Sequence, residues 1–208
     1  PILNGYLTIA LKRLEHQCII QILSDGIHWE QSPMYQNEVL NCLLDIAFDY
    51  KHLNLDIPEF ILNSIKKLAY SNAYMKKPNH YQPMQGDSDS TDLRDIITRS
   101  AYILKDGLLK YFGYHHVDPE SLWDIKNENI LEYEQLEIIQ PNFTSVALKE
   151  SGNFYLRDSF KEDSNYLWFR CGAIGSGHGH GEHLHFDLVC RGENFISDPG
   201  RFTYVEND

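Results

Sequence analysis

Four of the ten histidines lie within eight consecutive positions near the C-terminal end of the chain, in the stretch GSGHGHGEHLHFDL. Imidazole side chains can bind a metal ion or move a proton, so this cluster is the first candidate for chemistry. Glycines alternate with His178 and His180, which frees the backbone to place both side chains where an ordinary strand would not. A metal site and a catalytic base both remain open for this half of the cluster.

The second half of the cluster follows a different pattern. His183, His185 and Asp187 alternate with apolar residues, which is typical of a half-buried strand. We expect the two histidines on the solvated face of that strand. The opposite face would carry Leu184, Phe186 and Leu188.

A metal site can be built from this region. Two imidazoles at positions i and i+2 can approach one metal ion, and a carboxylate from the next strand can join them. Asp198, followed by a Pro-Gly pair, lies one hairpin further on, where it could face His180. Other metal templates fit less well, because H-E-x-x-H is absent and Glu182 follows His180 too closely for a cupin-type site.

Two further segments carry candidate groups. In SDGIHWEQSPMYQNEVL, a polar loop with Glu30 leads into a helix that starts near Tyr35, so this tyrosine is either a packed aromatic or a phenol presented to a cleft. In YQPMQGDSDSTDLRD, Asp87 and Asp89 could bind a cation or a substrate, but acidic and hydroxyl residues before an apolar helix are also ordinary capping residues.

The elements that must position these groups change type along the chain. Helical spacing predicts helices around 39–47, 57–74 and 93–104, with Pro58 in a first turn. From about Thr144 the period becomes two, with short strands on both sides of Ser151-Gly152 and a hairpin turn in CRGEN. Helices followed by strands predict an α+β chain, a helical α/α region (1–130) that feeds an antiparallel β-sandwich (141–208).

Composition excludes several classes of protein. The net charge of −12 argues against a nucleic-acid-binding protein, because such proteins need a basic surface. No apolar run approaches the roughly 20 residues of a membrane span. The start of the chain lacks the features of a signal peptide, and both ends interrupt a pattern, so we expect a fragment of a longer protein. Scattered among apolar residues, the cysteines are expected to be buried thiols rather than disulfides or ligands: Cys18, Cys42, Cys171 and Cys190.

Three segments, in this order, resemble the heparinase II/III-like polysaccharide lyases. DGIHWEQSPMYQ is similar to the motif that carries the catalytic tyrosine of that family, QGDSDSTD to its G-D-x-D element, and HGHGEHLHFDL with DPGRFTY to its histidine motif. The resemblance spans nearly the whole chain and implies part of an (α/α) toroid followed by an incomplete antiparallel β-sandwich. It also implies a periplasmic or secreted location, with the cytoplasm left open.

Position by position, the resemblance assigns roles to the candidates. Tyr35 matches the catalytic tyrosine, acting as acid and also as base, and His178 matches the catalytic histidine. His180 and Asp198 match two ligands of a structural zinc. Candidate substrate-binding residues are Glu30, Gln85 and Arg201.

The sequence departs from the family pattern at Glu182, where aspartate is common, and at Gln36, where histidine often follows the tyrosine. The carboxylate-binding Asn or His of the family would lie before Pro1, and a third zinc-binding histidine would lie beyond Asp208.

The implied reaction is β-elimination from an acidic, uronate-containing polysaccharide, of the heparan or hyaluronan kind first and alginate-like second. A phenol and an imidazole can share the two proton transfers that this reaction needs. A glycosidase would instead need paired carboxylates, and nothing in the sequence pairs Asp87 with Asp89, or Glu30 with Asp198. The alternative from another class is a non-catalytic carbohydrate-binding β-sandwich module whose histidines only hold zinc.

An acidic polysaccharide would be repelled at long range by the negative charge of the chain, so it would need a local basic patch. The candidates for that patch are Arg94, Arg99, Arg170, Arg191 and Arg201.

Overall fold

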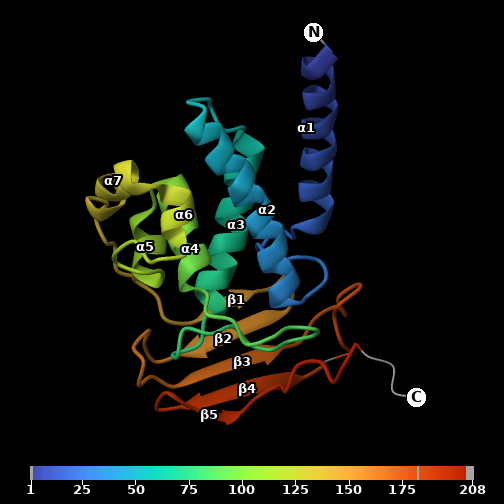
Figure 1. The fold of residues 1–208 in the computed structure, drawn as a ribbon. Helices are drawn as coiled ribbons and strands as arrows, with labels where there is room; N and C mark the ends of the chain where they lie inside the picture. Colours follow the sequence, from blue (N-terminus) through green and yellow to red (C-terminus); the bar gives the residue numbers. More distant parts are fainter. Residues whose placement is uncertain (1, 182, 205–208) are drawn as a thin grey trace.

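The computed structural model describes residues 2–181 and 183–204, and in it a group of helices stacks on a five-stranded antiparallel sheet (Figure 1). The helices are α1 (Ile2–Gln21), α2 (Pro33–His52), α3 (Glu59–Met75), α4 (Arg94–Leu104), α5 (Gly107–Phe112), α6 (Ser121–Ile125), the 3-10 helix η1 (Asn127–Asn129) and α7 (Ile130–Glu134). The strands are β1 (Val146–Leu148), β2 (Asn153–Arg157), β3 (Tyr166–Arg170), β4 (His185–Cys190) and β5 (Glu193–Ile196). This arrangement confirms the predicted class, helices followed by an antiparallel sheet.

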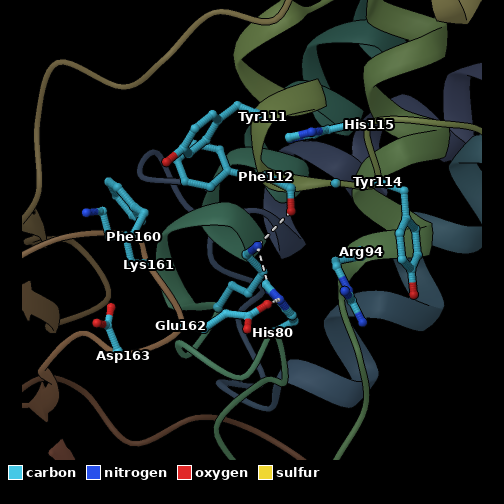
Figure 2. A pocket seen from close by; sticks show the side chains of 12 residues that line it. His80, Arg94, Tyr111, Phe112, Tyr114, His115, Phe160, Lys161, Glu162 and Asp163 are labelled. Carbon is cyan, nitrogen blue, oxygen red and sulfur yellow. Dashed lines mark hydrogen bonds and ion pairs between the residues drawn. The ribbon is translucent and has the colours of Figure 1, made fainter. Parts of the chain in front are cut away.

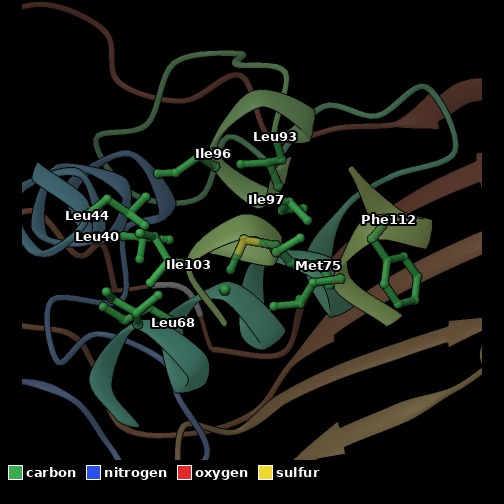
Figure 3. Packing of buried hydrophobic residues seen from close by; sticks show 14 of the residues in the cluster. Leu40, Leu44, Leu68, Met75, Leu93, Ile96, Ile97, Ile103 and Phe112 are labelled. Atoms are coloured by element: carbon green, nitrogen blue, oxygen red, sulfur yellow. The ribbon is translucent and has the colours of Figure 1, made fainter. Parts of the chain in front are cut away.

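The helical core is built from apolar stripes on α2, α3 and α4 (Figure 3). Pro33 begins α2, because its fixed φ suits a first helical turn and its missing N–H is not needed there. Leu40 and Leu44 of α2 are buried in the same core as Leu68 of α3 and Ile97 of α4. No helix within 2–181 and 183–204 is both long and apolar enough to cross a membrane.

The strands follow chain order across the sheet, and each pairs antiparallel with the next. The predicted turns are confirmed: β1 and β2 meet around Gly152, and β4 and β5 meet at Arg191-Gly192. Both glycines have positive φ, and a Cβ on Gly152 would lie 2.3 Å from the carbonyl oxygen of Cys171. Glycine is therefore required at this turn.

One end of the sheet is fixed to the C-terminal end of α3. The guanidinium of Arg157 donates to the carbonyl oxygens of Tyr74 and Lys76, and the hydroxyl of Tyr166 donates to that of Met75 at 2.9 Å. These carbonyls have no partner within the helix, so the sheet supplies the donors that α3 lacks. The guanidinium also lies 4.6 Å and 4.7 Å from the ring centroids of Phe160 and Tyr166.

The other end of the sheet is held by a buried polar chain. Asn153 donates to the amide oxygen of Gln31 at 3.0 Å and accepts from the indole N–H of Trp168 at 2.9 Å. The backbone N–H of Ser151 donates to the carboxylate of Asp25 at 2.7 Å. Helices and sheet therefore meet through hydrogen-bonded side chains as well as apolar ones.

Two expectations from the sequence are wrong. The face of β4 that meets the helices carries Asp187, which is 1% exposed, whereas Leu184 and Phe186 on the other face are 66% and 39% exposed. The alternation predicted correctly which residues share a face of the strand. It did not predict which face meets the helices, because polar side chains form that interface. His183 is exposed, as expected, and His185 is half-buried.

The cysteines are free thiols, as expected, but they are not buried: Cys18 is half-buried and the other three are exposed. Cys42 and Cys190 each stand next to a buried residue, Leu43 and Val189, and the helix or strand period turns them away from the core. Apolar neighbours in sequence therefore did not indicate burial.

Replacing Arg157 tests the attachment of the sheet to α3. We expect Arg157→Met to lower the free energy of unfolding by about 2–5 kcal/mol, because buried carbonyls lose their donors. Chemical denaturation measures this change, with Arg13→Met on the exposed surface of α1 as the control, expected within about 0.5 kcal/mol of the parent. Equal stabilities for the two variants would show that the contact contributes nothing.

Candidate active site

The loop before α2 brings Glu30 and Tyr35 to the sheet. Gly26 turns this loop with φ of +91°, and a Cβ there would lie 2.4 Å from the carbonyl oxygen of Lys67. The hydroxyls of Ser32 and Ser88 bond at 2.9 Å, and the hydroxyl of Ser88 also accepts from the backbone N–H of Met34. Tyr35 therefore stands in a first helical turn that is tied to the loop before α4.

Gln36 completes the attachment of this loop. Its amide oxygen accepts from the backbone N–H of His28 at 2.9 Å, and its amide nitrogen donates to Asn72 at 2.6 Å and to Ser71 at 3.0 Å. The residue that departs from the family pattern is thus a buried structural link. Glu182, the other departure, lies outside the described residues.

The glycine-rich segment between β3 and β4 runs against the same loop. A Cβ on Gly175 or Gly179 would lie 2.1 Å or 2.6 Å from the carbonyl oxygen of Glu30. Gly177, between them, has φ of +63°. The glycines are needed because this segment packs its backbone directly on the backbone of Glu30. This close contact places His178 beside α2.

Tyr35 and His178, from the helical part and the sheet part of the chain, meet face to face. Their rings stack with centroids 3.4 Å apart and an angle of 9° between the planes. Nδ1 of His178 lies 2.9 Å from Oε2 of Glu30. If Nδ1–H donates to this carboxylate, Nε2 carries a lone pair and can accept a proton.

The hydroxyl of Tyr35 has a second phenol beside it. The hydroxyls of Tyr35 and Tyr204 lie 3.1 Å apart, and the guanidinium of Arg201 lies 4.8 Å from the centroid of the Tyr204 ring. Arg201 in turn pairs with Asp89 at 2.7 Å and donates to the carbonyl oxygen of Asp87 at 3.3 Å. The hydrogen bond to Tyr35, followed in effect by desolvation and by Asp87, raises the pKa of Tyr204 well above its ordinary range.

The two side chains expected to bind zinc have different partners here. Nε2 of His180 lies 2.9 Å from Oδ1 of Asp87, whereas Oδ2 of Asp198 lies 3.5 Å from Nε2 of His185. His185 is also 3.4 Å from Oδ1 of Asp187, whose Oδ2 is buried and has no hydrogen-bond partner among the described residues. Within 2–181 and 183–204, no three His, Cys, Asp or Glu side chains are grouped to hold a metal ion.

The donor types suit zinc, but a complete set of three ligands is not present among residues 2–181 and 183–204. The zinc site therefore stays a prediction from the sequence. Metal analysis of His180→Ala and Asp198→Ala, with Asp87→Ala alongside, would test that prediction.

Of the residues expected to bind substrate, Glu30 contacts the stacked pair, Arg201 contacts Tyr204, and Gln85 is buried. Gln85 is 3% exposed, and its amide nitrogen is buried without a hydrogen-bond partner in the described structure.

Sequence reasoning missed two contacts at this site. The sequence presents Tyr204 only as part of a motif, and for Asp87 it predicts helix capping or the binding of a cation or a substrate. In the structure, Asp92 rather than Asp87 or Asp89 accepts from the first backbone N–H of α4, that of Arg94. The partners of Tyr204 and Asp87 are more than 90 positions away, so no local pattern could indicate them.

Two family models match this chain, one over its helical part and one over its strand-containing part. Residues 4–112 match the family described as Heparinase II/III N-terminus, and residues 140–208 match Heparinase II/III-like, C-terminal. A heparin-sulfate lyase of Pedobacter heparinus is 22% identical over 190 residues, which cover 88% of this chain and 26% of that protein.

Solved structures share the fold. A crystal structure of a mutant heparan sulfate lyase from Pedobacter heparinus has a TM-score of 0.76 and 22% identity over 94% of this chain. A heparinase III gene product has a TM-score of 0.76 and 19% identity over 95%. The chain spans 29% of each of these structures, so the likeness concerns one part of longer proteins.

The bond between the two phenols gives a spectroscopic prediction. Because the hydroxyl of Tyr35 raises the pKa of Tyr204, Tyr35→Phe should lower that pKa toward its ordinary value. An alkaline titration of tyrosine ring carbons by NMR measures the shift. Tyr6→Phe, an exposed tyrosine of α1, is the control and should leave Tyr204 unchanged. If Tyr204 titrates alike in all three proteins, the two hydroxyls are not bonded in solution.

Proposed function

The chain belongs to the heparinase II/III-like family, and from that premise we propose that it forms part of a polysaccharide lyase that cleaves uronate-containing polysaccharide by β-elimination. The stacked pair of Tyr35 and His178 carries the proposal, because it joins a phenol and an imidazole from the two parts of the chain. Relatives named as heparin-sulfate and heparan sulfate lyases support a heparan-type glycosaminoglycan as the first substrate class to test.

The reaction needs two proton transfers. A base removes the proton from C5, and the electron pair of that C–H bond forms the C4=C5 double bond. The bond between C4 and O4 breaks, its electron pair stays on O4, and an acid supplies the proton that O4 takes up. A positioned acid and base typically contribute about 10²–10⁴-fold each to such a step.

We assign the base to Nε2 of His178 and the acid to the hydroxyl of Tyr35. The Glu30 carboxylate at Nδ1 favours the tautomer with a lone pair on Nε2, and it stabilises the imidazolium that forms when the C5 proton is accepted. The second phenol, Tyr204, holds the hydroxyl of Tyr35 in place and can return a proton to it. Glu30 and Tyr204 are thus positioning residues for the pair.

The substrate carboxylate must be neutralised while negative charge develops at C5. Arg201 is the group of this chain that we propose for contact with the acidic sugar, because the amide nitrogen of Gln85 is buried. Glycosidase chemistry has less support, because the carboxylate of Glu30 is paired with His178 and that of Asp89 with Arg201.

Removing the hydroxyl of Tyr35 is the direct test. In the full-length protein, Tyr35→Phe should lower turnover by at least about 10²-fold while stability changes by only about 1 kcal/mol. The assay is the ultraviolet absorbance of the new C4=C5 double bond, on heparan, hyaluronan and alginate substrates. Tyr6→Phe is the matched control. Normal turnover by Tyr35→Phe would refute the mechanism, and a parent that binds these chains without cleaving any would indicate a binding module.

Replacing the imidazole and its partner separates their roles. We expect His178→Ala to lose about as much turnover as Tyr35→Phe, whereas His183→Ala, at an exposed position, should keep normal turnover. Glu30→Gln should lose at least about tenfold, because the amide no longer selects the tautomer of His178. The same absorbance assay measures all three, and a Glu30→Gln variant as active as the parent would remove Glu30 from the account.

A further inference from the structure

A cavity lies at the other end of the sheet from His178. It has a volume of about 770 Å³, within the usual range for ligand sites, and is bounded by the ends of α3 and α5, the start of α4 and the β2–β3 hairpin (Figure 2). β3 separates the two places, because it runs from Tyr166 beside this hairpin to Arg170 before the glycine-rich segment. The lining side chains used below are Lys76, His80, Arg94, Tyr111, His115, Phe160, Lys161 and Glu162.

Basic side chains outnumber acidic ones around this cavity, although the chain as a whole has a net charge of −12. The acidic residues of the lining are Glu162 and Asp163. The basic ones are Lys76, His80, Arg94, His115 and Lys161. Of the five arginines considered for a basic patch, Arg94 is the one that contributes here.

Lys76 is the buried centre of this cluster. Its ammonium donates to the carbonyl oxygen of Phe112 at 2.8 Å and lies 3.3 Å from Nδ1 of His80. Neither partner carries a negative charge, so within the described part of the chain this buried ammonium has no carboxylate bonded to it, although buried cations are usually paired. Burial, with Arg157 and Arg94 next in effect, lowers the pKa of Lys76 to about 7.

An exposed acid already approaches the cluster. Oε1 of Glu162 lies 3.0 Å from Nε2 of His80, and the side chain of Glu162 is 80% exposed. Such a side chain can turn into solvent at little cost, since exposed ion pairs contribute only about 0–1 kcal/mol. Glu162 therefore occupies a position that the anionic group of a ligand could take.

Aromatic rings provide the flat surfaces that sugar rings pack on. Tyr111 and Phe160 meet edge to face, with centroids 6.5 Å apart, and Figure 2 shows both beside the cavity. On the other side, the guanidinium of Arg94 lies 4.5 Å from the centroid of the Tyr114 ring and is held by Asp92. The cavity thus combines cations with aromatic faces.

We propose that this cavity binds the sulfate or carboxylate group of an acidic saccharide, at a site separate from Tyr35 and His178. The negative charge of the ligand is inferred from the basic side chains of the cavity alone. The choice of a saccharide over a free inorganic anion rests on the proposed function. Ligand binding here releases Glu162 from His80 and gives the ammonium of Lys76 a negative partner.

Binding is coupled to proton uptake. An anion favours the charged form of Lys76, so affinity should be full below pH 7 and should fall as the pH rises above about 7, where the free lysine is neutral. The charged and titratable groups that face Lys76 from the surrounding elements are His80, Asp92, Arg94, Arg157 and Glu162.

Calorimetric titration of full-length Tyr35→Phe, in which cleavage is blocked, tests the proposal. The titrants are a sulfated uronate oligosaccharide, a neutral oligosaccharide and sodium sulfate, at pH 6 and pH 8. The acidic oligosaccharide should show two binding events and the neutral one none. His115→Ala with Lys161→Ala, both at exposed positions, should weaken one event roughly tenfold, the loss of one charge-assisted hydrogen bond.

Controls separate this site from the active site. Lys149→Ala, an exposed lysine outside the cavity, should leave both events unchanged, and Lys76→Met should reduce the difference in affinity between pH 6 and pH 8 at this site. With Tyr35 intact, the double variant should keep normal turnover of short substrates.

A single binding event that the double variant leaves unchanged would overturn the site. Binding of sodium sulfate in the cavity without the saccharide would overturn the saccharide assignment. The absorbance assay shows separately whether the parent protein cleaves uronate chains. Failure of the proposed function can therefore be distinguished from failure of this binding site.

Discussion

The register between the helices and the sheet is the constraint on which the candidate site depends. Tyr35 belongs to α2 and His178 to the segment before β4, so their rings can stack only if the two layers meet in one position. Arg157 and Tyr166 set that position at one end by donating to carbonyl oxygens at the C-terminal end of α3 and its cap residue. These donors and acceptors are buried, and a shift of the sheet would leave them unsatisfied at a cost of about 1–3 kcal/mol each.

The same constraint explains why the interface is polar. Hydrogen bonds such as those joining Gln31, Asn153 and Trp168 need a fixed donor–acceptor geometry, so they hold only in one register. Close backbone packing adds to this, because Gly175 and Gly179 lie directly on the carbonyl of Glu30. The site is therefore fixed from both sides, through Glu30 on the helical side and the glycines on the sheet side.

Much of the fold was predictable from the sequence, because helix and strand periods are local. The stripe at Leu40 and Leu44 and the hairpin at Gly152 were found in this way, and Tyr35 and His178 were found as motif residues. The buried face of β4, with Asp187, was not, because the pattern cannot say which face meets a polar interface. Tyr204 and the pairing of His180 with Asp87 also escaped, because these contacts join residues far apart in sequence.

The central claim is that Tyr35 and His178 act as one proton-transfer unit, and a double-mutant cycle on turnover tests it most directly. Groups that work as a unit have strongly non-additive effects, because removing either disables the other. The account predicts that Tyr35→Phe with His178→Ala in the full-length protein loses no more turnover than the more damaging single change. Losses that multiply, or a double variant that cleaves uronate chains normally, would contradict it.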